Sequence, residues 1–189
     1  MKRHYSCLPV ASVSEGYFSL TTVQDAHIDS IRQWRNAQLD VLRQAACISN
    51  EQQERYYERE IWPTLNQPHP NNVLLVFLER ECPVGYGGLV HISWEHARAE
   101  VSFLLDPILT ADIPTYSRYF SAYLDLLKRL AFDELRLHRL FTETFANRND
   151  HICVLEANRF RLEGRLRKHV RIGGTPVDSL IHGCLQDEQ

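Results

Sequence analysis

The sequence RAEVSFLL at residues 98–105 and the sequence YFSAYLDLLKRLAFDELRLHRLFTETF at residues 119–145 decide the fold. From residue 98 to 105, apolar and polar side chains largely alternate, which is the period of a strand. From residue 119 to 131, apolar side chains recur every three or four positions, as in a helix that packs on one face, and residues 139–145 alternate again. A strand, a crossover helix and a second strand form a parallel βαβ unit.

A unit of this kind has a preferred place for ligands. Unpaired backbone N–H groups and the helix dipole lie where the first strand ends and the helix begins. We therefore expect the functional site along residues 98–145, close to a shorter helix that opens at His151.

The length of 189 residues predicts a single domain over residues 1–189, and a content of 44% hydrophobic and 24% charged residues is typical of a globular protein. The net charge of −3 gives no electrostatic basis for binding nucleic acid. No apolar run approaches the ~20 residues that a membrane span needs, and we recognise no signal peptide. We therefore expect a cytoplasmic protein with no nucleic-acid or membrane partner.

The cysteines suggest neither a zinc site nor a disulfide framework. The five cysteines show neither a CxxC nor a Cys/His ligand spacing, and an odd count fits a reducing compartment. The basic run RFRLEGRLRKHVR at residues 159–171 alternates with apolar residues. We interpret this basic run as the exposed face of a strand. The alternative is that its basic side chains bind phosphates.

The remaining elements follow from local signals. We expect a strand at residues 17–23, a helix from an N-cap at Asp25 to about residue 42, and a second helix after a capping box at Ser49–Gln52. Strands at residues 73–78, 84–93 and 98–105 form an antiparallel meander, and strands at residues 161–172 and 177–185 form a hairpin. The GYGG sequence at residues 85–88 opens no helix, so its glycines indicate a bulge or close packing.

Four phrases resemble a known family. They are AEVSFLLDP at residues 99–107, LAFDELRLHRLFTETFANRND at 130–150, VLEANRF with RLEGRLR at 154–167, and VDSLIHGCL at 177–185. These phrases resemble motifs A and B of the GNAT superfamily, the acyl-CoA-dependent N-acyltransferases, and the likeness covers about residues 17–185. It implies an α/β (α+β) GNAT fold, with a mixed central sheet of about seven strands and helices on both faces.

The resemblance also implies where acetyl-CoA binds, as acyl donor. In the family it lies in a gap between two strands, which here are residues 98–105 and 139–145. A bulge in the first of these strands would free the backbone at Phe103, Leu104 and Leu105 to pair with the pantetheine arm. Asn147 or Asn149 would contact the pantetheine or the ribose, unless it only caps the next helix.

The chain departs from the family where the diphosphate should bind. The family has Gln/Arg-x-x-Gly-x-Gly/Ala there, and its two small positions fall on Arg118 and Phe120. In one interpretation Asp112 or Thr115 caps the helix, while Ser117 and Arg118 bind phosphate with their side chains; Thr115 is included among the expected cofactor-binding residues. In the other, the protein keeps the fold but binds acyl-CoA poorly or not at all.

The reaction that the resemblance implies is attack of a primary amine on a thioester, which requires a neutral amine and therefore a base. We expect Glu100 as this base, with His151 as the second candidate and His91, Glu143 and His182 as weaker ones. The alternatives are a structural salt bridge for Glu100 and a helix cap or packed ring for His151. The tyrosine that the family often uses as an acid is replaced by Leu155.

The acceptor is expected between the first two helices and the C-terminal hairpin. Trp34, Arg35 and Asn36 resemble a motif of two GNAT branches, which acetylate ribosomal-protein N-termini and UDP-linked 4-amino sugars. The surrounding sequence IRQWRNAQLDVLRQ at residues 31–44 favours the sugar branch. Together with Tyr86 these residues are the expected substrate-binding residues, although Trp34 could equally pack in the core and Arg35 could form an internal salt bridge.

We therefore predict an N-acetyltransferase that moves an acetyl group from acetyl-CoA to a primary amine of a small molecule, with a nucleotide-linked amino sugar (a UDP-amino-sugar) as the favoured acceptor. The alternatives are a protein N-terminal acetyltransferase and a GNAT-fold binding module that has lost catalysis. The sequence leaves the oligomeric state open, and a homodimer is one of the options.

Overall fold

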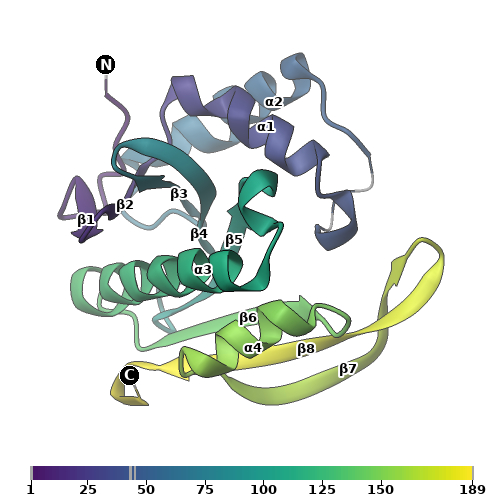
Figure 1. The fold of residues 1–189 in the computed structure, drawn as a ribbon. Helices are drawn as coiled ribbons and strands as arrows, with labels where there is room; N and C mark the ends of the chain where they lie inside the picture. Colours follow the sequence, from purple (N-terminus) through teal and green to yellow (C-terminus); the bar gives the residue numbers. More distant parts are fainter. Residues whose placement is uncertain (1, 43, 45, 189) are drawn as a thin grey trace.

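A computed structural model describes residues 2–42, 44 and 46–188. Within them lies one mixed sheet of eight strands in the order β1-β2-β3-β4-β5-β6-β8-β7. Four α-helices accompany it, with α1 and α2 on one face and α3 and α4 on the other (Figure 1). The predicted GNAT-type α+β architecture is confirmed, with one strand more than expected.

The additional strand is β1, Ser12–Glu15, which pairs antiparallel with β2, Phe18–Thr22. This strand has little signature in the sequence, because it is four residues long and Val13 is its one buried residue. Gly16 closes the hairpin at φ +56°, a conformation that favours glycine.

The predicted meander is present as β3, Val73–Glu79, β4, Cys82–Ser93, and β5, Arg98–Leu105. The glycines of β4 serve close packing, as expected. A Cβ on Gly87 would lie 2.0 Å from the Ser102 carbonyl oxygen and 2.6 Å from the Tyr123 hydroxyl. The missing side chain therefore allows Tyr123 to donate a 2.6 Å hydrogen bond to that carbonyl.

The crossover unit also forms as predicted. α3, Ile113–Lys128, continues as a π-helical turn at Arg129–Glu134 and leads into β6, Arg139–Phe145. The next elements are α4, Asn149–Ala157, and the hairpin of β7, Arg161–Ile172, with β8, Thr175–Leu185. β8 pairs with β6, so β7 is the outer edge of the sheet.

The first helical region differs from the expectation. α1 spans Ile28–Asn36 and is followed by a separate turn at Leu39–Val41, so it ends before residue 42. Asp25 is not the N-cap, because Gln24 and His27 form a reciprocal cap at this point. Asp25 instead pairs with Arg3 at 2.9 Å.

The second helical region begins as predicted. α2, Asn50–Tyr56, opens with the Ser49–Gln52 capping box and continues through a π-helical turn at Tyr57–Ile61 and a 3₁₀ turn at Trp62–Asn66.

The two faces of the sheet carry separate cores. The larger core packs α3 against the sheet and includes Phe77, Leu105 and Phe120. The smaller core packs α1 and α2 on the other face and includes Trp34 and Leu104. Adjacent residues of β5 therefore point into different cores, as the alternation of the strand requires.

Candidate active site

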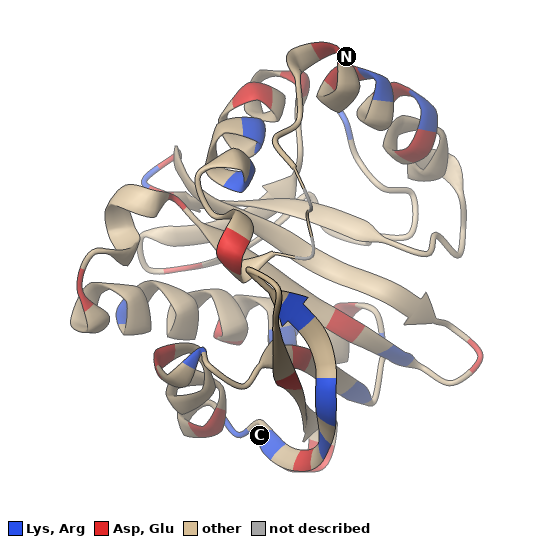
Figure 2. Cartoon of the chain, turned by 90° about the vertical axis from the view of Figure 1, so that its right-hand side faces the viewer, with Lys and Arg blue, Asp and Glu red and all other residues tan. Residues whose placement is uncertain are grey.

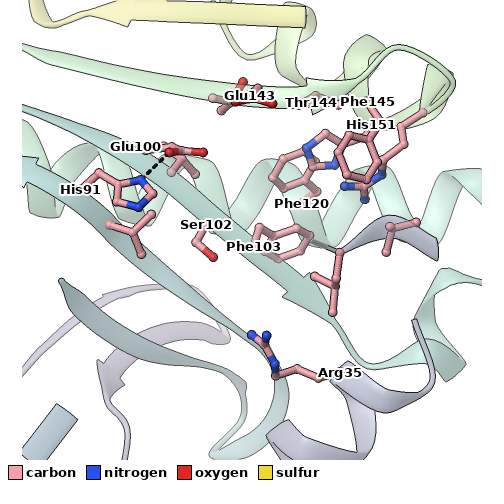
Figure 3. Close-up of a pocket in the computed structure, with 16 residues that line it drawn as sticks. Arg35, His91, Glu100, Ser102, Phe103, Phe120, Glu143, Thr144, Phe145 and His151 are labelled. Atoms are coloured by element: carbon pink, nitrogen blue, oxygen red, sulfur yellow. Dashed lines mark hydrogen bonds and ion pairs between the residues drawn. The ribbon is translucent and has the colours of Figure 1, made fainter. Parts of the chain in front are cut away.

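The candidate site lies where β5 and β6 part. The two strands pair in parallel only from Arg98 to Glu100 on β5 and from Arg139 to Phe141 on β6. Beyond these pairs the strands diverge, and a cavity of about 240 Å³ opens between them (Figure 3). The gap predicted between these two strands is therefore present.

Glu100 lies at the inner end of this cavity and is bound to His91 of β4. The His91 Nδ1 atom is 2.7 Å from the Glu100 Oε2 atom, and the carboxylate is only 13% exposed (Figure 3). The register of β4 against β5 shifts between Val90 and Ser93, and His91 has φ +49°. This corrects the expected bulge, because the irregularity falls in β4 and not in β5.

A second carboxylate, Glu143, lines the same cavity from β6. Its side chain is 17% exposed, and its Oε1 atom lies 3.7 Å from Nε2 of His169 on the β7–β8 hairpin. Two carboxylates on two diverging strands thus border one cleft (Figure 3). Such an arrangement attracts a cation and can accept a proton from it.

His151 is a packed ring at the outer end of the cleft. It stacks on Phe120 with ring centroids 4.3 Å apart, and Phe120 stacks on Phe103 at 4.4 Å. The His151 Nδ1 atom lies 2.6 Å from the Tyr116 hydroxyl oxygen. Burial, together with Arg148 and His182, lowers the pKa of His151 well below its ordinary value. The ring is therefore neutral at pH 7, and the structure favours the alternative of a packed side chain.

The start of α3 does not fit a diphosphate in the manner of the family. The Asp112 side chain already accepts the Thr115 N–H at 2.9 Å, and Pro114 has no N–H to offer. Phe120, at one of the small positions, is fully buried in the aromatic stack. The Asp112 carboxylate therefore occupies the place that an anion would take at this helix end.

The other predicted phosphate ligands lie away from the cleft. The Arg118 Nη2 atom lies 3.6 Å from Oε1 of Glu79, and the Arg118 guanidinium carbon lies 4.5 Å from the centroid of the Tyr119 ring. Thr115, Ser117 and Arg118 line neither the cavity between β5 and β6 nor the neighbouring one.

A second cavity of about 640 Å³ lies at the mouth of the gap and is lined by Asn147, Arg148, Asn149, Tyr116 and His151. Arg148 lines both this cavity and the cleft. Burial lowers the pKa of Arg148, and within the described chain no carboxylate lies at ion-pair distance from it. Sequence reasoning named the two asparagines and missed the arginine between them.

The backbone edge of β5 is partly occupied. Gln38, beyond the end of α1, donates from Nε2 to the Leu105 carbonyl oxygen at 2.8 Å. Phe103 lines the cleft, whereas Leu104 and Leu105 are buried in the two cores. Leu155, at the family's tyrosine position, is fully buried, so no acid group lies there.

Of the predicted substrate residues, Arg35 lines the cleft, while two of its neighbours have structural roles (Figure 3). Trp34 is 8% exposed and packs in the smaller core. Asn36 holds the backbone of Ile48 by accepting its N–H at 2.8 Å and donating to its carbonyl at 2.9 Å. Tyr86 is 6% exposed and borders a third cavity, which Arg35 also lines.

Among residues 2–42, 44 and 46–188, no group of three or more His, Cys, Asp or Glu side chains is arranged to hold a metal ion. In the same part of the chain, no helix is both long and apolar enough to cross a membrane.

Comparisons with known proteins agree with this geometry. Residues 20–181 match the family described as "Acetyltransferase (GNAT) domain", and the chain belongs to this family of acetyl-CoA-dependent N-acetyltransferases. Among solved structures, the spermidine N-acetyltransferase from Vibrio cholerae in complex with CoA and spermine has a TM-score of 0.78 at 18% identity, covering 92% of this chain and 98% of that one. A GNAT-family protein from Chromobacterium violaceum has a TM-score of 0.75 at 16% identity, covering 99% and 92%. At these identities the likeness shows the shared fold.

Proposed function

We propose that the protein acetylates a small-molecule primary amine, with the cleft between β5 and β6 as the place of transfer. The observation that supports this most is the pair of carboxylates, Glu100 and Glu143, on the two strands that border the cleft. They attract the ammonium form in which a primary amine reaches the protein at neutral pH.

Acetyl-CoA supplies the activated acetyl group: the amine nitrogen bonds to the thioester carbonyl carbon, the C–S bond breaks, and CoA leaves as a thiolate. Glu100 accepts a proton from the bound ammonium, because a carboxylate at the inner end of the cleft can reach it and only the neutral amine attacks a thioester. His91 is a positioning residue, since its 2.7 Å contact fixes the orientation of the Glu100 carboxylate.

The base role of Glu100 predicts that Glu100→Gln lowers kcat roughly 100-fold or more, the usual contribution of a positioned base. Binding of acetyl-CoA, measured by calorimetry, stays unchanged. Glu95→Gln, at an exposed position in the turn between β4 and β5, is the matched control and keeps wild-type turnover. Retained kcat in Glu100→Gln removes this residue from the mechanism.

Arg148 is the cation that we propose for the diphosphate of acetyl-CoA, in place of the start of α3. It lines both cavities and has no carboxylate partner within the described chain. Arg148→Ala should weaken acetyl-CoA binding roughly tenfold or more, since a hydrogen bond to a charged group contributes about 1.5–3 kcal/mol. The affinity for S-acetylpantetheine, which lacks the diphosphate, should not change.

The matched variant is Arg118→Ala, because Arg118 lies on α3 and pairs with Glu79. We expect its acetyl-CoA affinity to equal that of the wild type. If Arg118→Ala weakened acetyl-CoA binding and Arg148→Ala did not, the diphosphate would have to bind at the start of α3.

The cleft supports a primary amine as acceptor, but it does not distinguish between classes of amine. The sequence favours a nucleotide-linked amino sugar, whereas the Vibrio cholerae relative is a spermidine acetyltransferase with spermine bound. Protein N-termini are a third class. We would therefore compare kcat/KM for UDP-linked 4-amino sugars, spermidine and peptides with free N-termini. Acetylation of none of these, and of no simple alkylamine, would contradict the proposed function.

A further inference from the structure

A third cavity extends the site away from the place of transfer. It has about 260 Å³ and lies between α2, the turn after it and β4. Three tyrosines, Tyr56, Tyr57 and Tyr86, form its walls together with Gln53 and Arg35. Arg35 also lines the cleft between β5 and β6 (Figure 3). The two spaces therefore meet at its side chain.

The interior of this cavity contains an unsatisfied donor. Tyr57 is 1% exposed, and its hydroxyl forms no hydrogen bond of good geometry among the described residues, although the Tyr86 hydroxyl lies beside it. A buried polar group without a good partner is costly, and a ligand that accepts from the Tyr57 hydroxyl in this cavity would remove that cost. Burial and the neighbouring Tyr86 raise the pKa of Tyr57 well above its usual value, and burial raises the pKa of Tyr86 to about 12. Both hydroxyls are therefore protonated and able to donate.

Arg35 supplies a positive charge at the same place. Its Nε atom donates to the Gln44 Oε1 atom at 3.0 Å, which fixes the plane of the guanidinium. Within the described chain, no hydrogen bond or ion pair occupies its two terminal nitrogens. Among the described residues that line this cavity there is no carboxylate, in contrast to the cleft with Glu100 and Glu143.

We propose that this cavity binds an anionic group of the acceptor, a carboxylate or a phosphate, through Arg35 and the Tyr57 hydroxyl. The inference rests on the proposed function, because the amine of the same molecule then lies at Glu100 and Glu143. The acceptor is thus an amine with a negative charge at its other end. A polyamine would place a second ammonium beside Arg35, where like charges repel.

Steady-state kinetics with matched acceptors test this class. The anionic probes are the ω-amino acids from 3-aminopropanoate to 6-aminohexanoate, the ω-aminoalkylphosphonates and a UDP-linked amino sugar. The comparison probes are alkylamines and diamines of the same lengths. We expect the anionic acceptors to have the highest kcat/KM and the diamines the lowest. The carboxylate and phosphonate series distinguish the two sources of negative charge.

Arg35→Gln should lower the ratio of kcat/KM between anionic and uncharged acceptors roughly 10- to 100-fold, the effect of losing a charge-assisted hydrogen bond. Tyr57→Phe should lower this ratio less than Arg35→Gln does, because the substitution removes one uncharged hydrogen-bond donor. Arg32→Gln is the matched control, since Arg32 lies on the same helix and pairs with Asp29 at 2.7 Å. An equal loss for all acceptors, or a preference for diamines, would overturn the proposal.

Calorimetry separates this inference from the proposed function. Glutarate carries carboxylates but no amine, so it can occupy the cavity without reacting. Glutarate binding to the wild type that is lost in Arg35→Gln supports the anion site even where no amine is acetylated. Absence of binding to the wild type, together with acetylation of alkylamines as good as that of ω-amino acids, would overturn the anion site and leave the transferase intact.

Discussion

His151 shows how one residue of the site depends on its surroundings. The ring is 7% exposed, stacked on Phe120 and bonded to the Tyr116 hydroxyl, so protonation would place a charge in an apolar stack. Its pKa is lowered in the folded chain, whereas the unfolded chain titrates near the ordinary value of about 6.5. The unfolded state therefore binds more protons below pH 6.5.

This linkage predicts that the free energy of unfolding falls as the pH is lowered from 7 to 5. His151 contributes to this fall because its ring stays neutral in the folded chain while the unfolded chain takes up a proton. His151→Gln, which keeps a partner for the Tyr116 hydroxyl, should lose that contribution and show a shallower pH dependence in urea unfolding. His96 is exposed, so His96→Gln is the control and should show the same dependence of the unfolding free energy on pH as the wild type. The same pH dependence in His151→Gln as in the wild type would contradict the prediction.

At the scale of the element, the start of α3 carries the largest departure from the family. Asp112 caps the helix, and its interaction with the Thr115 N–H lowers the pKa of the carboxyl group. Asp112→Ala removes this cap and should therefore lower the melting temperature of the protein. The affinity for acetyl-CoA should not change, because we place the diphosphate at Arg148.

Asp106→Ala is the charge-matched control for this prediction. Asp106→Ala removes one negative charge from the same loop. It also removes the acceptor of the Ile108 N–H, but it leaves the Asp112 cap of α3 in place. Calorimetric titration of both variants with acetyl-CoA checks the result. Tighter binding in Asp112→Ala alone would show that the diphosphate lies at the start of α3 after all.

Elements with strong local signals were predictable from the sequence. The alternation in residues 98–105, the capping box at Ser49 and the diglycine turn at Gly173 each depend on near neighbours, and the structure confirms all three. α1 was expected to be longer because apolar residues continue to Leu42. The chain leaves the helix after Asn36, whose side chain bonds to Ile48, and such a distant contact has no local signature.

The site was predictable to a similar extent. Glu100 follows from the position of its strand, and the missing small residues at Arg118 and Phe120 follow from the family pattern. The consequence of Phe120 was not predictable, because the stack with Phe103 and His151 requires α3, β5 and α4 to come together. The third cavity likewise combines α1, α2 and β4, which no single stretch of sequence relates to one another.

At the scale of the whole molecule, the sheet consists of two parts. Strands β1 to β5 form one antiparallel part and β6 to β8 the other, and only three residue pairs join β5 to β6. α3 runs between the two parts as the crossover and packs in the larger core. This division explains why one cleft can receive residues from both faces of the sheet, Arg35 from one and His151 from the other (Figure 3).

The outer edge of the second part has a consequence for self-association. β7 is a long edge strand, largely exposed, and edge strands of this kind offer a template for pairing with another chain. Lys and Arg residues lie along it, as Figure 2 shows with the tip of the β7–β8 hairpin towards the viewer. Exchange of Arg167 and Arg171 for threonine should therefore increase light scattering at high protein concentration, while Lys2→Thr, at an exposed N-terminal position, should not. We therefore expect the basic run to limit pairing between copies of this chain along β7.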